Sequence, residues 1–256
     1  MISRRQSSAQ ELVRLLNSAP ASTEVRDLAQ AQWIFVCAPD DALPVLAEAM
    51  TVLPMPWKDL NVAHTSGTLG AEVFDTLATM GATACSMHPA VSLSGAADDW
   101  QKISTATFGI EGGGEALVRA RNLLQELGAT AVTIPVGGKI GYHLACVLVS
   151  NYLVTLHAMA LQVLDGAPED DALRRLLMEL SRDTLKNLSS QPPAIALTGP
   201  IVRGDVGTVA AHLEFLKNKF PTLLELYVAL GNETLKYARP SKLQELEKLF
   251  GKQISD

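Results

Sequence analysis

The feature that most restricts the fold of this chain is a change of pattern near Gly137-Gly138. Before this point, short apolar runs typical of buried strands alternate with amphipathic helical segments, and after it only helical segments follow. Regular alternation of strands and helices is typical of a doubly wound parallel sheet with helices on both faces. We therefore predict an α/β domain over residues 1–136, followed by an all-α domain over residues 137–256.

The expected elements can be placed from apolar periodicity and from Gly and Pro breaks. Strands are expected at residues 32–39, 60–66, 83–89, 107–113 and 129–135. Helices are expected in the first half at 8–18, 41–50, 70–81 and 114–128. In the second half they are expected at 140–164, 170–188, 206–219, 222–237 and 241–250.

Composition excludes several classes of protein. The formal net charge of -6 argues against a nucleic-acid partner, which requires clustered Lys and Arg. No secretion signal opens the chain, and the three cysteines are far apart in apolar runs, which predicts buried thiols in a cytoplasmic protein. The histidines and cysteines do not have metal-ligand spacing, so no metal site is expected.

The segment from residue 144 to residue 164 is apolar enough to resemble a membrane span. It contains several polar side chains that lipid would penalise, and it is the one segment of its kind in the sequence. A helix that is apolar on nearly all sides is also typical of the buried centre of a soluble domain. We therefore expect a fully buried helix and no membrane contact.

Polar residues follow three of the predicted strands. Pro39 and Asp40 end the first strand, His64 and Ser66 end the second, and His88 ends the third. The carboxyl ends of parallel strands face one crevice, where ligands bind. We predict substrate contacts for His64, Ser66 and His88, although each histidine could instead be a satisfied, half-buried imidazole. Pro39 and Asp40 are predicted cofactor contacts, although Asp40 could instead cap the following helix.

The helix expected after Gly138 carries the densest set of reactive side chains. Lys139 and His143 are four residues apart and share one helix face, Ser150 lies near that stripe, and Asn151 is turned further round. A lysine at a helix N-terminus is unfavourable against the helix dipole, although it could reach water by extending its stem. We predict that Lys139 exchanges protons with a substrate, supported by His143, and that Asn151 helps to orient the substrate.

A second signature, ALTGPIVRGDVGTVAAHL, contains Arg203 and Asp205. Arg203 could bind a carboxylate or phosphate through two hydrogen bonds, or form a structural ion pair. Asp205 precedes a helical pattern, so capping is the simplest interpretation, with substrate binding as the alternative.

Together these motifs resemble a known family. The stretches SRRQSSA, CAPDDAL, HTSG, HPAVSLSG, GIEG, KIGYHLACVLVSNYL and ALTGPIVRGDVGTVAAHL are similar to those of proteins that pair a Rossmann-like domain with a domain catalogued as domain of unknown function 2520. That family looks related to the 6-phosphogluconate and β-hydroxyacid dehydrogenases. The resemblance implies NAD(P) binding and a helical, 6-phosphogluconate-dehydrogenase-like domain that forms a homodimer.

The resemblance also implies a catalytic role for Lys139. In β-hydroxyacid dehydrogenases a lysine is the acid/base and an asparagine follows four residues later. Lys139 matches that lysine, whereas His143 stands in place of the asparagine and could itself titrate near pH 7.

Family members begin with a strand and a G-x-G-x-x-G loop before the segment that matches Ser3, Arg4 and Arg5. This chain starts at that segment, so we expect an N-terminally truncated Rossmann-like sheet, produced by a start codon placed too far downstream. The same three residues could still contact the adenosine ribose phosphate, but without the glycine loop they would hold the cofactor poorly. The paired arginines favour NADP over NAD.

Three functions are compatible with these features. The first is an NAD(P)-dependent oxidoreductase acting on a small carbonyl, hydroxyl or imine substrate. The second is a dimeric binding or scaffold protein with a degenerate cofactor site. The third, a hydrolase that uses Ser66 with His64 or His88, has weaker support because no nucleophile-elbow motif surrounds Ser66.

Overall fold

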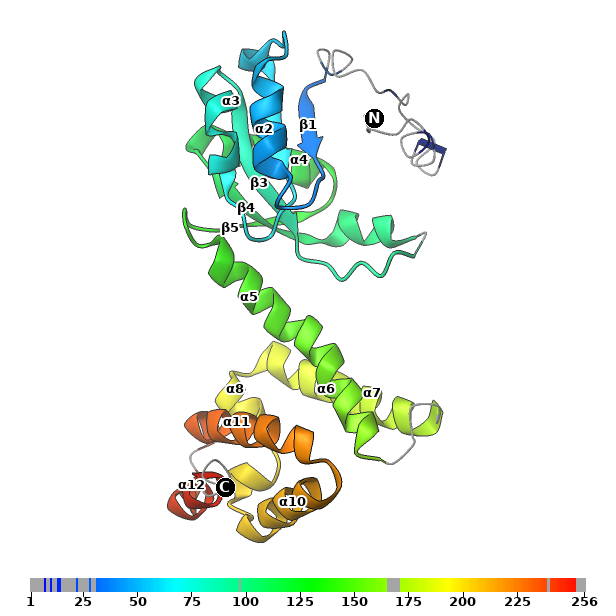
Figure 1. Ribbon diagram of the computed structural model, residues 1–256, viewed down its shortest axis with the longest axis vertical. Helices are drawn as coiled ribbons and strands as arrows, with labels where there is room; N and C mark the ends of the chain where they lie inside the picture. The colour runs from blue at the N-terminus through cyan, green and yellow to red at the C-terminus, as the bar shows by residue number, and fades with distance from the viewer. Residues whose placement is uncertain are drawn as a thin grey trace. The chain divides into compact units, whose positions relative to one another are not determined.

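The structure, a computed structural model, describes residues 31–96, 98–164, 171–238 and 240–251, together with Ser7, Gln10, Val13, Arg14, Ser22 and Leu28. The chain divides into two compact units, Met1–Asn151 and Tyr152–Asp256, here called the sheet unit and the helical unit (Figure 1). The division lies after helix α5 (Lys139–Val149), rather than before it as the sequence pattern led us to expect. Helix α5 belongs to the sheet unit because Lys139 is hydrogen-bonded into it.

The sheet unit contains five strands in sequential order, which confirms the α/β prediction. They are β1 (Trp33–Val36), β2 (Asn61–His64), β3 (Thr83–Pro89), β4 (Thr107–Gly112) and β5 (Thr130–Thr133). Strands β1, β2 and β3 are mutually parallel, as are β4 and β5.

The prediction of a wholly parallel sheet is wrong at one pair, since β3 and β4 are antiparallel. A parallel neighbour requires a crossover connection, usually a helix packed on the sheet. The described residues between β3 and β4 form a 3-10 helix, η4 (Asp99–Thr105), and no α-helix, and the chain comes back to the sheet at the end of β3. Pro89 therefore pairs with Phe108, and the Ala90 amide donates to the Thr107 carbonyl.

Helices cover both faces of the sheet (Figure 1). Helices α2 (Leu43–Thr51) and α3 (Asp75–Thr79), the latter preceded by η3 (Ala71–Phe74), cover one face, and α4 (Gly114–Glu126) covers the other. Successive side chains of a strand point to opposite faces of the sheet, so neighbouring residues of β2 belong to different cores. Val62 packs with Phe74 and Leu77, whereas Ala63 packs in the core that contains α4. A further 3-10 helix, η2 (Trp57–Asp59), precedes β2.

The expectation of three buried thiols is met only at Cys85, on the central strand β3. Cys37 is exposed because it follows β1, the strand at one end of the sheet. Cys146 is half-buried on α5. All three thiols are free.

The helical unit confirms the all-α prediction for the second half. Its long helices are α7 (Asp171–Ser190), α10 (Val206–Lys219) and α11 (Pro221–Ala238), and it ends with α12 (Leu243–Gly251). Two short helices, α8 (Pro193–Ala196) and α9 (Pro200–Arg203), were not expected from the sequence pattern. Its core packs α10, α11 and α12 together through Val209, Leu213, Val228, Leu235, Leu246 and Phe250.

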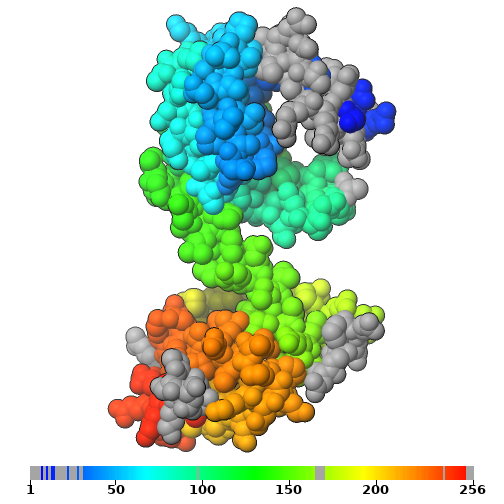
Figure 2. All heavy atoms as spheres, viewed as in Figure 1, coloured from blue at the N-terminus to red at the C-terminus, as the bar shows by residue number. Residues whose placement is uncertain are grey.

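The expectation of one fully buried helix over residues 140–164 is wrong. Helix α5 is followed, after a local break at Ser150, by α6 (Asn151–Gln162), and apolar side chains on both helices are exposed. Ile140 is 72% exposed and Val154 is 71% exposed. By length and composition, Lys139–Gln162 could cross a membrane, and none of its most apolar 18-residue stretch is buried. Figure 2 shows atoms of α5, in green, at the molecular surface.

Candidate functional site

A pocket of about 260 Å³ lies in the sheet unit, between the end of β3 and helix α5. Two imidazoles, His88 and His143, form part of its wall, and the side chains of Ser92 and Cys146 are nearby. The remaining lining residues are Ala90, Val91, Val147, Val149, Ser150 and Asn151. No lysine, arginine, aspartate or glutamate is among these lining residues.

Lys139 anchors the start of α5 to the sheet and is only 2% exposed. Its Nζ donates to the carbonyl oxygen of Ser66 at 2.9 Å and to Ser86 Oγ at 2.8 Å. Ser66 follows β2 and Ser86 lies on β3, so the ammonium joins α5 to two neighbouring strands. This contact also places the ammonium beside the strand ends that carry His64 and His88, both of which it influences electrostatically.

Burial lowers the pKa of Lys139 to about 8, although the nearby Glu111 and Asp40 carboxylates oppose the shift. That pKa suits proton transfer, but Lys139 is not part of the pocket wall, and its Nζ is bonded to protein atoms. In this arrangement Lys139 holds α5 against the sheet, and its catalytic role stays a prediction.

The loop after β2 uses His64 and Ser66 for its own support. His64 is fully buried, its Nε2 lies 2.9 Å from the Gly70 carbonyl oxygen, and its Nδ1 accepts from the Ser66 amide. The neutral tautomer with a proton on Nε2 satisfies both contacts, and burial lowers the pKa of His64 accordingly.

The Ser66 hydroxyl oxygen accepts from the backbone amides of Thr68 and Leu69. The ring nitrogens of His64 and the hydroxyl oxygen of Ser66 are thus hydrogen-bonded within the loop, and the substrate contacts of these residues stay predictions. The hydrolase alternative loses its proposed nucleophile for the same reason, because no hydrogen bond joins the Ser66 hydroxyl to an imidazole of the described residues.

The predicted cofactor-contact residues fall into two groups. Ser3, Arg4 and Arg5 lie outside the described residues. Pro39 and Asp40 are exposed at the turn between β1 and α2. Asp40 does not cap α2, which has no side-chain cap; it accepts a 2.5 Å hydrogen bond from the Thr68 hydroxyl.

Partial burial acts to raise the pKa of Asp40, but the hydrogen bonds from Thr68 and Ser66 outweigh it and the pKa is lowered. Asp40 therefore supports the loop after β2 as an ionised carboxylate near neutral pH.

Two rings of α5 dock where glycine leaves room for them. Tyr142 lies against Gly109 of β4, where an added Cβ would be 2.5 Å from the ring carbon Cζ and 2.6 Å from the hydroxyl oxygen. His143 lies against Gly67 in the same manner. A side chain at either glycine would push the corresponding ring away, so the two glycines shape this wall of the pocket.

His88 connects the end of β3 to these rings. Its Nδ1 is 2.9 Å from the Tyr142 hydroxyl, and its ring packs edge-on against Tyr142 and His143, with centroid separations of 5.5 and 5.8 Å. Burial, reinforced by the positive charge of Lys139, lowers the pKa of His88 to about 4. His88 is therefore neutral at pH 7. Within the described part of the chain, neither ring nitrogen of His143 has a hydrogen-bond partner.

The other predicted site residues are divided between the two units. Asn151 contributes to the pocket wall. Arg203 and Asp205 belong to the helical unit and pair with each other, with Arg203 Nε 2.8 Å from Asp205 Oδ2. Asp205 occupies the N-cap position of α10, but its carboxylate binds Arg203 and makes no cap hydrogen bond. The ion-pair interpretation of Arg203 is thus confirmed, and the capping interpretation of Asp205 is wrong.

Sequence reasoning missed three residues that organise the site. Tyr142 bonds His88, Ser86 accepts from Lys139, and Glu111 is a buried carboxylate that accepts from the Ala71 amide at 2.6 Å. The positions of Tyr142, between Lys139 and His143, and of Ser86, two residues before His88, could have pointed to them. Glu111 could not be found in this way, because its partner Ala71 is 40 residues distant in the sequence and because β4 is antiparallel to β3 instead of parallel. No cluster suited to metal binding occurs among the described residues.

Comparison with known proteins places the chain in a family. The family model described as "Domain of unknown function (DUF2520)" matches residues 106–234, about half of the chain, and the protein belongs to this family. No curated protein matches the chain in sequence.

Two solved structures resemble this one. Protein TM1727 from Thermotoga maritima has 23% identity and a TM-score of 0.65, with 98% of this chain and 90% of that chain covered. A putative NADP oxidoreductase, BF3122 from Bacteroides fragilis, has 20% identity and a TM-score of 0.64, with 92% and 87% covered. At these identities the likeness establishes a shared fold, a Rossmann-like sheet followed by helices.

We predict that Lys139→Met destabilises the sheet unit by about 2–4 kcal/mol. The substitution removes the positive charge near the buried Glu111 carboxylate and takes a donor from the Ser66 carbonyl. Lys58→Met, at an exposed lysine of the same unit, should change the free energy of unfolding by less than about 0.5 kcal/mol.

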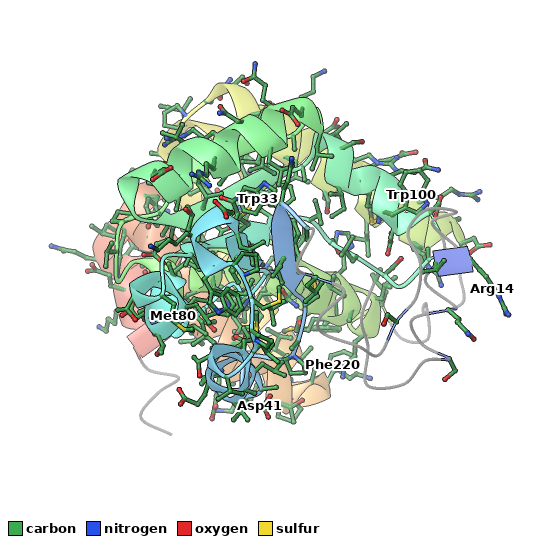
Figure 3. The ribbon with its side chains drawn as sticks, turned by 90° about the horizontal axis from the view of Figure 1, so that it is seen from above. Arg14, Trp33, Asp41, Met80, Trp100 and Phe220 are labelled. Atoms are coloured by element: carbon green, nitrogen blue, oxygen red, sulfur yellow. The ribbon has the colours of Figure 1, made fainter. Side chains whose placement is uncertain are left out.

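Tryptophan fluorescence during urea unfolding can measure this change, because Trp33, Trp57 and Trp100 all lie in the sheet unit (Figure 3 labels Trp33 and Trp100). Equal unfolding midpoints for Lys139→Met and Lys58→Met would show that the ammonium does not hold α5 in place.

A second prediction concerns acid. The pKa of His88 is about 4 in the fold, below its ordinary value of 6.5, so the unfolded chain binds a proton between these values that the folded chain does not. The free energy of unfolding should therefore decrease as the pH falls from 6.5 to 4. His88→Gln should weaken this dependence in the same fluorescence assay, leaving the part due to His64, whereas His212→Gln in the helical unit should not. An unchanged pH slope in His88→Gln would contradict the assignment.

Proposed function

We propose that this protein is an oxidoreductase that reduces a small carbonyl compound, or oxidises the corresponding alcohol, with NADPH or NADP as the hydride partner. The observation that carries the proposal is the pocket formed by His88 and His143 at the carboxyl end of β3, in a sheet of Rossmann-like fold. Ligands of open α/β sheets bind at that edge. A similar fold occurs in a protein described as a putative NADP oxidoreductase.

In this proposal a nicotinamide supplies or accepts the hydride, and the pocket handles the substrate oxygen. Reduction adds a hydride to the carbonyl carbon and one proton to its oxygen, so a proton donor must face the pocket. His143 has ring nitrogens available for that role, and His88 offers a neutral imidazole beside it. Lys139 contributes by holding α5, which carries His143, against the sheet.

The described residues fit the substrate end of such a site better than the phosphates of a dinucleotide. The turn between β1 and α2, residues 37–42, contains no glycine and carries two aspartates. In the next loop, the space at Gly67 is taken by His143 and the space at Gly70 by two glutamate carboxylates. The proposal therefore assigns phosphate binding to the segment containing Ser3, Arg4 and Arg5.

This proposal predicts that NADPH stabilises the sheet unit against heat. At 100 times its Kd, a ligand stabilises the folded state by about 2.7 kcal/mol, which should raise the Tm by roughly 5–10 °C. Replacing Arg4 and Arg5 together by Ala should reduce the NADPH shift more than the NADH shift, whereas Arg203→Ala should preserve both. The measurement is thermal unfolding followed by tryptophan fluorescence.

If neither nucleotide shifts the Tm of the unmodified chain, the oxidoreductase proposal fails and the binding or scaffold function is favoured. That second function has its own support in the exposed apolar surface of α5 and α6 and in the lack of a phosphate cradle among the described residues.

We further propose that a second copy of the chain covers the exposed apolar surface of α5 and forms a homodimer. From residue 140 to residue 164 the sequence contains no Asp, Glu, Lys or Arg, so a partner surface without charge is required. A two-fold symmetric copy supplies such a surface because the same patch meets itself. The exposed apolar side chains of α5 include Ile140, Leu144, Leu148 and Val149.

The dimer proposal predicts that replacing Leu144 and Leu148 together by Asp yields a monomer, whereas Val45→Asp, at an exposed apolar position of α2, leaves a dimer. Sedimentation equilibrium measures the mass of each form. A monomeric unmodified protein would refute the proposal. So would a protein that floats with phosphatidylcholine vesicles through the same two leucines, because lipid would then be the partner.

A further inference from the structure

We propose that Tyr142 holds His88 in the tautomer that carries its proton on Nε2, and that the pocket thereby selects an uncharged ligand with a carbonyl oxygen over a carboxylate. If the protein is the proposed oxidoreductase, this ligand is its substrate. The tautomer and the ligand selection do not depend on that function. Tyr142 is a positioning residue in this arrangement, since it acts through His88 and is not itself part of the pocket wall.

The contact between the two side chains determines which nitrogen carries the proton. The Tyr142 hydroxyl and His88 Nδ1 are 2.9 Å apart, and one of them must donate. The hydroxyl also contacts the Cys146 thiol and the Gly109 backbone. A backbone amide can only donate to the hydroxyl oxygen, and a thiol is a weak acceptor, so the hydroxyl donates its proton to Nδ1, the strongest acceptor of the three. A neutral imidazole then carries its one proton on Nε2, the nitrogen that is free to donate to a ligand in the pocket.

The surroundings keep His88 in that state. Burial disfavours the charged ring, and Lys139 opposes a second positive charge nearby. The Lys139 ammonium lies 5.5 Å from the centre of the Tyr142 ring, so one cation influences both members of the pair. The hydroxyl reaches its place only because residue 109 is glycine.

The rest of the pocket wall favours a ligand without charge. Its side chains are two imidazoles, small hydroxyls, an amide, a thiol and aliphatic groups. Lys139 and Asp40 act on His88 from outside the wall with opposite effects, and the His143 imidazole in the wall acts in the same direction as Lys139. A carboxylate in this pocket would meet no lysine or arginine in the wall to compensate for lost hydration, whereas a carbonyl oxygen needs a single N–H donor.

The first experiment measures the tautomer directly. Proton–nitrogen correlation spectra of the full chain, labelled with ¹⁵N-histidine, distinguish Nδ1–H from Nε2–H, and His88→Gln identifies the His88 signals. We expect Nε2–H at pH 7.5 in the unmodified protein and a mixture of tautomers in Tyr142→Phe. An Nδ1–H tautomer or an imidazolium in the unmodified protein would overturn the inference.

The helical unit offers a matched control. His212 Nδ1 and the Tyr227 hydroxyl are also 2.9 Å apart, with edge-on rings. Tyr227→Phe should change the His212 signals and leave those of His88 unchanged. A Tyr227→Phe effect on His88 equal to that of Tyr142→Phe would show a general change of structure and would contradict a specific role for Tyr142.

The second experiment tests selection with two probes of similar shape, cyclohexanone and cyclohexanecarboxylate. Ligand-observed saturation transfer at pH 7.5 should detect cyclohexanone binding and no carboxylate binding at equal concentration. Tyr142→Phe should weaken cyclohexanone binding by roughly twofold, because only the fraction of His88 rings that carry the proton on Nε2 can donate to the ligand. Gly109→Ala should weaken it similarly, since the added Cβ displaces the Tyr142 hydroxyl, and it serves as the test if Tyr142→Phe does not fold.

Equal binding of the two probes, or cyclohexanone binding unaffected by both variants, would refute the inference. Neither experiment requires NADPH. A protein that shows the predicted tautomer and probe selection but no thermal shift with NADPH would refute the proposed oxidoreductase function and leave the present inference intact.

Discussion

The site depends on one buried ammonium group. Lys139 joins the first turn of α5 to β2 and β3 through the Ser66 carbonyl and the Ser86 hydroxyl, and it does so out of contact with water. Burying a cation is costly unless hydrogen bonds and opposite charge compensate for lost hydration. Glu111 on β4 contributes the opposite charge, so three neighbouring strands together determine where α5 begins.

Once α5 is held there, its next turn forms the pocket. Tyr142 and His143 are consecutive residues, yet each enters a separate space left by a glycine, one on β4 and one in the loop after β2. Their rings meet His88, which reaches them from the end of β3. The pocket therefore combines side chains from a strand end and a helix start, and its shape requires the correct neighbours at both glycines.

Much of the fold could be predicted because strands and helices leave local patterns. The segment TACSMHP matches β3 along its whole length, and residues 206–219 match α10. The direction of β4 could not be predicted, since an apolar run reads the same for a parallel and an antiparallel neighbour. Burial of the segment after Gly138 was also misjudged. Apolar composition shows that a surface needs a partner but does not show whether that partner lies within the same chain.

The sequence by itself determined that Lys139 and His143 share a helix face and that His64 and His88 end neighbouring strands, because these follow from helical and strand periods alone. Only the tertiary structure decided their roles. Lys139 is hydrogen-bonded to residues of two strand segments, and both ring nitrogens of His64 are hydrogen-bonded within the loop after β2. His88 and His143 line the pocket. The physical reason is that spacing fixes the direction of a side chain from its backbone. The hydrogen bonds and the exposure of that side chain depend on the neighbouring surface, which is formed by segments distant in the sequence.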